Sequence, residues 1–181
     1  INTTNMPSLP HRDQIDQSHL ETLSECPWCR SEARIKLFVE NGFDYVQCLA
    51  CKLIYLGTRL KEDFVSRIYD SNSYHGAASA EWTLRVGQKR LALLGRLDRS
   101  LRIHEDGCGA GGFAAACRDA GHEITASDVG SDAAQRARTL FGVEVRAGSL
   151  AAMAIPDSSL DVVASFNLLS HLYRPWEYMR E

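Results

Sequence analysis

The sequence predicts an α/β protein in which a short antiparallel ribbon precedes a parallel sheet. Two observations predict it. Two Cys-x2-Cys pairs, separated by eighteen residues, flank a hairpin-like alternation, and from residue 101 onward short apolar strands alternate with helical segments. The chain of 181 residues is 45% apolar and 24% charged, which is typical of a globular protein. The expected parts are a flexible lead at residues 1–22, the ribbon at 23–56, a helical connector at 57–100 and the sheet at 101–181.

Charge and hydropathy exclude several classes of protein. The formal net charge of −3 excludes a strongly basic nucleic-acid coat. No apolar run approaches the ~18 residues of a membrane span. The first 14 residues are polar and lack the basic and apolar regions of a secretory signal. We therefore expect a cytoplasmic protein that does not enter a membrane.

The paired cysteines predict a metal site. Two thiolates three positions apart in a tight turn can bind one metal ion from the same side, and a second such turn supplies the four sulfur ligands that zinc prefers. Between the pairs, Asn41-Gly42 favours a hairpin turn. Two disulfides in a secreted protein are the alternative, which the missing secretory signal disfavours. The sequence predicts a zinc ribbon with the ligands Cys26, Cys29, Cys48 and Cys51.

A helix is expected near residues 79–97, between the ribbon and the sheet. Four apolar residues fall at helical spacings, namely Trp82, Val86, Leu93 and Leu97. The basic residues among them, which include Arg90, are expected on a solvated face of this helix.

The remaining segments alternate between strand and helix, which predicts a parallel sheet with helices on both sides. The last strand, 160–166, is almost entirely apolar, as expected for a strand buried on both faces. In chain order we expect strand 101–105, helix 111–120, strand 123–127, helix 131–141, strand 143–146 and strand 160–166.

A glycine-rich segment, EDGCGAGG at 105–112, joins the first of these strands to its helix. Glycines at such a turn let the backbone approach a ligand closely. Asp128 ends the second strand, where an acid can hold the hydroxyls of an adenosine ribose. These residues leave NAD and S-adenosylmethionine both open. Glu105 favours S-adenosylmethionine, because a carboxylate there would repel a pyrophosphate and would tolerate an ammonium or sulfonium group.

Four segments together resemble the class I S-adenosylmethionine-dependent methyltransferases, namely 103–113, 124–138, 143–153 and 156–175. The resemblance implies a Rossmann-like core and an enzyme that transfers a methyl group. The ribbon is similar to the zinc-binding N-terminal segment of one methyltransferase subgroup, in which a comparable CPxC…CxxCxLIY run precedes the core. Because the family's sheet continues beyond its fourth strand and the sequence opens on Ile rather than Met, we expect this sequence to be cut at both ends. The strand at 160–166 would then lie at an edge, and this length of chain would lack much of the acceptor half and be inactive alone.

The resemblance also implies site residues. Glu105 would contact the amino group of the cofactor, Asp128 the ribose hydroxyls, and Val129 the adenine. His104 and Asp106 depart from the family, which usually has apolar residues there, and Ser149 stands where many relatives have an acid. The cofactor-binding residues that the resemblance implies are Glu105, Gly107, Gly109, Gly111, Asp128, Val129, Ser149, Leu150 and Asn167.

His171 is the candidate base for the reaction. It follows the fourth strand, at the mouth of the family's site, and a base is needed only when the methyl acceptor must lose a proton. The alternative is a histidine that makes local hydrogen bonds where a helix starts.

Several functions agree with these patterns. A small-molecule or saccharide-type acceptor is favoured, because residues 101–181 carry seven basic and eleven acidic side chains. An RNA methyltransferase is disfavoured, since residues 1–60 carry six basic and seven acidic side chains and no aromatic and basic stripe. A zinc-ribbon remnant without catalytic activity is a further alternative, and an NAD-dependent oxidoreductase is the most distant one. The sequence does not determine the oligomeric state.

Overall fold

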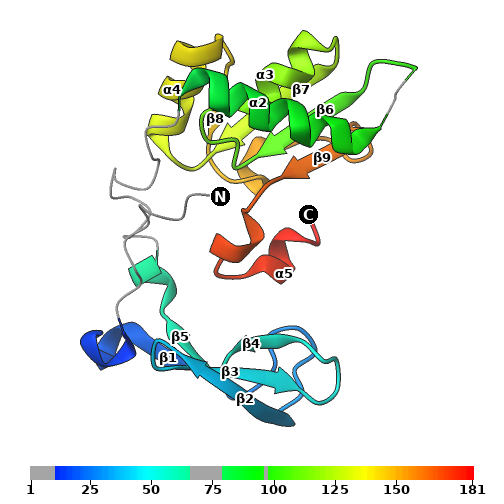
Figure 1. The fold of residues 1–181 in the computed structure, drawn as a ribbon. Coiled ribbons are helices and arrows are strands. Elements are labelled where there is room, and N and C mark those ends of the chain that lie inside the picture. Colours follow the sequence, from blue (N-terminus) through cyan, green and yellow to red (C-terminus); the bar gives the residue numbers. More distant parts are fainter. Residues whose placement is uncertain (1–10, 66–78, 96–97) are drawn as a thin grey trace. The chain divides into compact units, whose positions relative to one another are not determined.

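The structure is a computed structural model that describes residues 11–65, 79–95 and 98–181, drawn in colour in Figure 1. The chain divides into two units, Ile1–Ser71 and Asn72–Glu181, and each is described by itself. Parts of the predicted lead and connector, at 1–10, 66–78 and 96–97, lie outside the described residues. None of the described helices has the length and apolar character needed to cross a membrane.

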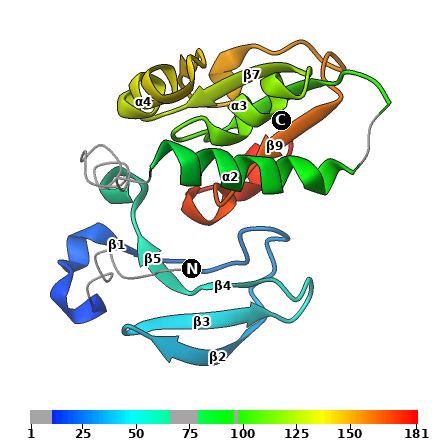
Figure 2. The same ribbon diagram turned by 45° about the horizontal axis from the view of Figure 1, so that its top comes forward.

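The first unit contains the predicted hairpin. Asn41 and Gly42 form its two-residue turn with φ angles of 49° and 78°, both in the left-handed region that a type I′ turn requires. A further strand, which the sequence did not predict, pairs with the second strand of the hairpin. The result is an antiparallel sheet in the order β2-β3-β4, formed by Arg34–Glu40, Phe43–Cys48 and Ile54–Leu56 (Figure 2).

The segment before the ribbon is ordered from residue 11 onward, so the interpretation of 1–22 as a flexible lead is wrong for 11–22. The side chains of His11 and Asp16 accept backbone N–H groups and so begin two short 3-10 helices. Ile15 and Leu20 are buried, which holds the segment against the unit. Its elements are η1 Arg12–Gln14, η2 Gln17–His19 and β1 Leu20–Thr22, and β1 pairs with β5, Thr58–Leu60, from the predicted connector.

The second unit is built on a parallel sheet in the order β8-β7-β6-β9. The strand predicted at 143–146 begins later in the structure. Val143 and Val145 pack into the core, and only the next two residues, Arg146 and Ala147, pair with β7. As predicted, the last strand lies at an edge of the sheet within the described residues. The strands are β6 Arg102–Asp106, β7 Glu123–Asp128, β8 Arg146–Ala147 and β9 Val162–Ser165.

Helices cover one face of this sheet. Helix α3, Gly112–Asp119, joins β6 to β7, and α4, Ser131–Phe141, joins β7 to β8. The chain advances through these strands in one direction, so right-handed crossovers place both helices on the same face. On the other face Thr125 and Val163 are exposed, Val163 by 53%. The expectation of a last strand buried on both faces is therefore wrong at Val163. Farther along the same face, Asp106 and Ser127 are buried, and Tyr178 lies close to Asp106.

Helix α2, Ala80–Leu91, begins at the predicted position, with the Ser79 side chain as its N-cap, and continues as η3, Ala92–Leu94. Of the apolar residues at helical spacing, Trp82 and Leu93 are 58% and 78% exposed, Val86 is half-buried, and Leu97 lies outside the described residues. The helix instead packs on α3 through Gly87. A Cβ on Gly87 would lie 2.1 Å from the carbonyl oxygen of Gly112, so the two backbones approach too closely for any side chain there.

We expect Gly87→Ala to destabilise the second unit. Alanine in a helix interior gains up to about 1 kcal/mol over glycine, but the new methyl group would overlap a backbone carbonyl that cannot move freely. Overpacking of this kind costs roughly 1–3 kcal/mol, so the net free energy of unfolding should fall. Denaturant unfolding followed by helical circular dichroism reports on α2, α3 and α4 together.

The exposed neighbour Gln88 supplies the matched control, because Gln88→Ala changes the same helix without entering the contact. It should shift the free energy of unfolding by no more than about 0.5 kcal/mol. A Gly87→Ala protein as stable as the wild type would contradict the packing described.

Candidate cofactor site

The glycine-rich loop lies between the end of β6 and the start of α3. The backbone N–H groups of Gly107 and Cys108 both donate to the carbonyl oxygen of Ser127, at 2.9 and 3.1 Å, which ties the loop to the end of β7. A Cβ on Gly109 would meet no atom within 4 Å, so this part of the loop faces open space. Gly111 has φ 77° and a Cβ there would lie 2.8 Å from the Cβ of Ala137, so only glycine fits.

Asp128 lies beside this loop at the end of β7. Its Oδ2 accepts the N–H of Gly109 and its Oδ1 that of Gly130, both at 2.8 Å. The N–H of Gly148 donates to the Asp128 carbonyl at 3.0 Å, which brings the segment after β8 to the same place. The predicted residues Ser149, exposed, and Leu150, half-buried, follow directly, and Val129 is 72% exposed next to Asp128.

Glu105 is buried on the helix-covered face and is only 1% exposed. Its Oε2 accepts the N–H of Ala114 in the first turn of α3, at 3.1 Å. Burial raises the pKa of Glu105 to about 8, and the charge of Asp128 adds to this, whereas Arg90 and the Ala114 N–H act in the opposite direction. The Glu105 carboxyl group is therefore largely protonated at neutral pH in the absence of a ligand.

The segment after β9 reaches the same loop. A Cβ on Gly107 would lie 3.1 Å from the side chain of Leu168, so this segment crosses next to the glycine loop. Asn167 is exposed, with φ 60°, and His171 is half-buried in η5, Leu169–His171. Burial lowers the pKa of His171, which keeps its imidazole neutral near pH 7.

The unusual polarity of His104 and Asp106 has a structural explanation. Both point to the face of the sheet opposite α3 and α4, in rows with Thr125 and Ser127 of β7. His104 Nδ1 lies 2.8 Å from Thr125 Oγ1 and Nε2 lies 2.9 Å from Ser127 Oγ, which in turn donates to Asp106. These buried groups are thus satisfied by one another, and Tyr178 of α5, Pro175–Tyr178, lies close enough for Asp106 to raise its pKa, although burial is the larger cause.

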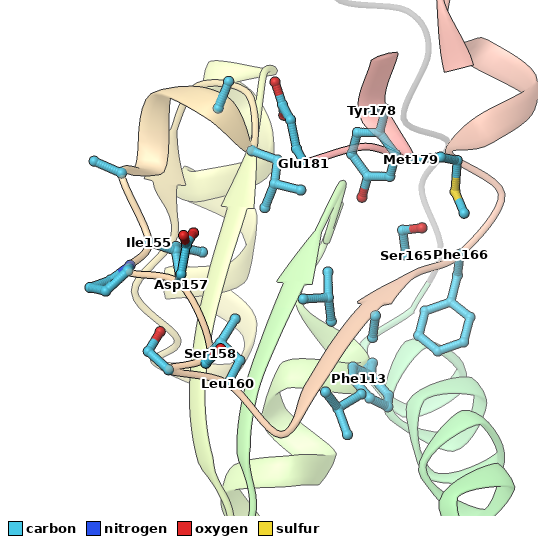
Figure 3. Close-up of a pocket in the computed structure, with 18 of the residues that line it drawn as sticks. Phe113, Ile155, Asp157, Ser158, Leu160, Ser165, Phe166, Tyr178, Met179 and Glu181 are labelled. Carbon is cyan, nitrogen blue, oxygen red and sulfur yellow. The ribbon is translucent and has the colours of Figure 1, made fainter. Parts of the chain in front are cut away.

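Arg90 is a residue that sequence reasoning placed wrongly. It was expected on a solvated face, but its guanidinium lies 4.3 Å from the ring centroid of Phe166, which itself packs edge-on against Phe113. Arg90 lines a cavity of about 1180 Å³ that runs along β9, with Phe113, Ser165, Phe166 and Tyr178 among its walls (Figure 3). Leu84, Leu91 and Leu94 pack on the core beside Gly87, and Arg90 is half-buried on this side of the helix.

The four predicted zinc ligands come together in the first unit. Their sulfur atoms all lie within 4.8 Å of one another, with Cys26 and Cys51 at 3.6 Å and Cys29 and Cys48 at 3.5 Å. Four sulfurs about 2.3 Å from a tetrahedral zinc ion would lie about 3.8 Å apart, so the arrangement fits this ion.

Both cysteine turns have the same backbone geometry. The N–H of Arg30 donates to the carbonyl of Cys26 at 2.9 Å, and that of Lys52 to the carbonyl of Cys48 at 3.0 Å. Arg30 and Lys52 also share a left-handed backbone, with φ 64° and 67°. Two turns built alike present their paired sulfurs in the same way, as a shared metal ion requires.

Comparison with known proteins bears on the second unit. Residues 104–181 match the family described as methyltransferase domain. Residues 104–181 are therefore similar to a methyltransferase domain. An uncharacterized methyltransferase of Mycolicibacterium gilvum is 32% identical over 127 residues, which are 68% of this chain and 49% of the relative. A probable S-adenosylmethionine-dependent methyltransferase of Mycolicibacterium smegmatis is 31% identical over 80 residues, 44% of this chain and 31% of that protein.

Among solved structures, a magnesium protoporphyrin IX methyltransferase from Synechocystis, crystallised with S-adenosylmethionine, is similar with a TM-score of 0.45. The identity is 20%, over 63% of this chain and 65% of that one. This chain spans about half the length of the Mycolicibacterium gilvum relative and less than half the length of the Mycolicibacterium smegmatis relative. Within the matched residues 104–181, the glycine loop and the segment after β9 lie side by side.

We expect the second unit to lose stability as the pH rises from about 5 to about 9 through the titration of Glu105. The folded state holds the Glu105 proton more tightly than the unfolded chain, so the stabilisation is complete below the unfolded pKa and is lost as the pH rises through about 8. A shift of this size corresponds to roughly 3–5 kcal/mol. Denaturant unfolding across this pH range measures it.

Glu105→Gln removes the titrating group and keeps an oxygen that can accept the Ala114 N–H. The difference in unfolding free energy between the wild type and this variant isolates Glu105, since the histidines titrate in both. Parallel pH profiles for the two proteins would contradict the assignment.

Proposed function

We propose that this chain is the cofactor-binding part of an S-adenosylmethionine-dependent methyltransferase that modifies a small-molecule acceptor, preceded by a structural zinc ribbon. The observation that carries the proposal is the open space at Gly109 beside Asp128, within a methyltransferase domain. The polar groups at the two ends of this space differ chemically, so each can bind a different part of the cofactor.

The residues around the glycine loop match the parts of S-adenosylmethionine. Asp128 retains free lone pairs beyond its two backbone hydrogen bonds, which can accept the ribose hydroxyls. Val129 exposes an apolar surface for the adenine, next to Ser149 and Leu150. Glu105, at the other side of the loop, supplies a carboxyl group for the amino end. When bound, S-adenosylmethionine supplies an activated methyl group on a sulfonium.

Catalysis of such a displacement depends mainly on alignment and on the exclusion of water. Asn167 and Leu168 lie where the chain passes the glycine loop and would line the reaction site. His171 is the proposed base, since its lowered pKa leaves the imidazole able to accept a proton from an acceptor hydroxyl or amine at neutral pH. Acceptors without a proton to lose would not need it.

Charge supports a small-molecule acceptor rather than a nucleic acid. Residues 101–181 carry four more acidic than basic side chains (eleven against seven), and residues 1–60 carry one more (seven against six). A protein that grips a nucleic-acid backbone needs a basic surface. Retention on RNA that weakens with salt would reverse this preference.

We propose a structural role for zinc in the ribbon. The four sulfur ligands leave no open position for a substrate, as in other closed sites of this type. Cys26 and Cys48 are fully buried, so the ion would substitute for a hydrophobic core that this small sheet otherwise lacks.

Asp128→Ala should weaken binding of S-adenosylhomocysteine by about 10- to 100-fold, the effect of losing a charged hydrogen-bond acceptor. Isothermal titration calorimetry with S-adenosylhomocysteine, S-adenosylmethionine and NAD measures the affinities directly. Asp119→Ala, which removes an exposed carboxylate of the same domain, is the control and should bind as the wild type does. Binding of NAD and of neither sulfur compound would contradict the proposal, and binding of none of them would favour the non-catalytic alternative.

Zinc should be present at about one equivalent per chain, held by the four cysteines. Metal analysis of the purified protein measures it, and Cys29→Ser should abolish the bound zinc. Cys117→Ala removes a buried cysteine outside the cluster and should leave the zinc content unchanged. A protein without zinc, and without free thiols at these four positions in the absence of reductant, would show disulfides instead.

A further inference from the structure

The sheet β2-β3-β4 of the ribbon has one covered face and one open face. The register places Val46 opposite Tyr55, and Val46 is buried because the chain that leads into β5 lies against it, with a Cβ on Gly57 only 3.2 Å away. Residues directly opposite each other share a face, and successive residues of a strand alternate between faces. The apolar residues on the other face, which we call the open face, are Ile35, Phe38, Phe43, Tyr45, Ile54 and Leu56.

This open face is apolar where a sheet that faces water is normally polar. Ile35, Phe38 and Ile54 are 45%, 49% and 51% exposed. The ring of Phe38 stacks on that of Tyr45, with the centroids 4.5 Å apart and 16° between the ring planes. Six apolar side chains gathered on one exposed face, two of them as an aromatic stack, indicate a surface that binds a partner.

The two ends of the open face carry opposite charges. Glu40 lies on this face at the hairpin turn, opposite Phe43. At the other end, the side-chain amide of Gln47 donates to the carbonyl of Lys52 at 3.3 Å, which places Lys52 beside the face near the second cysteine turn. Glu40 and Lys52 form no ion pair within the described part of the chain. The face therefore has an acidic end, an apolar middle and a basic end.

We propose that the open face is a homodimer interface, in which two copies of this chain pack face to face about a two-fold axis. A surface that is acidic at one end and basic at the other is complementary to itself in this arrangement, which is the commonest one among homo-oligomers. Each Glu40 would meet the partner's Lys52, and the stacked aromatic rings would lie in the middle, where aromatic residues contribute most to binding.

The same observations disfavour two other kinds of contact. A nucleic acid needs a basic surface, whereas the middle of this face is apolar and one end is acidic. Pairing of two β2 strands edge to edge is disfavoured because the register of β2 shifts between Lys36 and Phe38, and an irregularity of this kind blocks the addition of a strand.

Sedimentation equilibrium of the full chain, with zinc present, should show a monomer and a dimer in reversible exchange between about 1 and 100 µM, as expected for a small interface. Phe38→Lys should weaken the dimer by about 100-fold or more, because it places a charge in the apolar middle of both copies. Val39→Lys is the matched control. Val39 is the next residue of β2 and is equally exposed, at 52%, but it lies opposite Asp44 on the other face. This variant should dimerise as the wild type does.

Charge reversal tests the two-fold arrangement separately. Glu40→Lys and Lys52→Glu should each weaken the dimer by about 10-fold, because the two-fold axis makes every reversal create two contacts between like charges. The double variant should recover most of the lost affinity, and circular dichroism and zinc content check that each variant is folded.

A wild-type chain that stays monomeric at about 100 µM would overturn the inference and assign the open face to another part of the chain or to a different partner. Equal loss of the dimer in Phe38→Lys and Val39→Lys would overturn it as well, as would a dimer that Phe38→Lys leaves intact. A double variant no better than the single ones would contradict the face-to-face packing about a two-fold axis.

Discussion

The glycine loop is tied by its backbone to the end of the neighbouring strand, and the candidate site depends on this tie. Two successive N–H groups, of Gly107 and Cys108, converge on the Ser127 carbonyl, and the N–H of Gly109 binds the Asp128 side chain. A loop held at three points cannot move independently of β7. The glycine loop and Asp128, the proposed ribose-binding acid, are therefore positioned together at the carboxyl edge of a parallel sheet, where such folds bind ligands.

Near this edge, the two faces of the parallel sheet carry different kinds of side chain. On the helix-covered face, Ile103 and Phe113 form a small apolar core, and Glu105 is the one charged side chain of β6 that points into it. On the other face, His104 and Asp106 form a chain of hydrogen bonds with the polar side chains of β7. The polar residues at the end of β6 are thus compensated locally, so they do not by themselves argue against an intact cofactor site.

The ribbon is stabilised in a different way from the parallel sheet. Its sheet exposes large side chains on both faces, including Phe38 and Val39, so hydrophobic burial contributes little. Two identical turns that gather four sulfurs provide the alternative, because a metal ion can replace a core in a unit of this size. Pairing of β1 with β5 then joins residues on either side of the ribbon, which explains why the segment at 11–22 is ordered.

The sequence by itself specified four features through local chemistry. These are the Asn41-Gly42 turn, the four clustered cysteines, the glycine loop and the order of strands and helices around Asp128. Each depends on residues close together in the chain or on a spacing that one metal ion or one turn imposes. Only the tertiary structure decided which side of α2 is buried, because Leu84, Leu91 and Leu94 pack on the core whereas Trp82 and Leu93 of the same segment are exposed. It also decided that Arg90 stacks on Phe166, and that one face of the sheet carries a polar network, since both depend on segments brought together from distant parts of the chain.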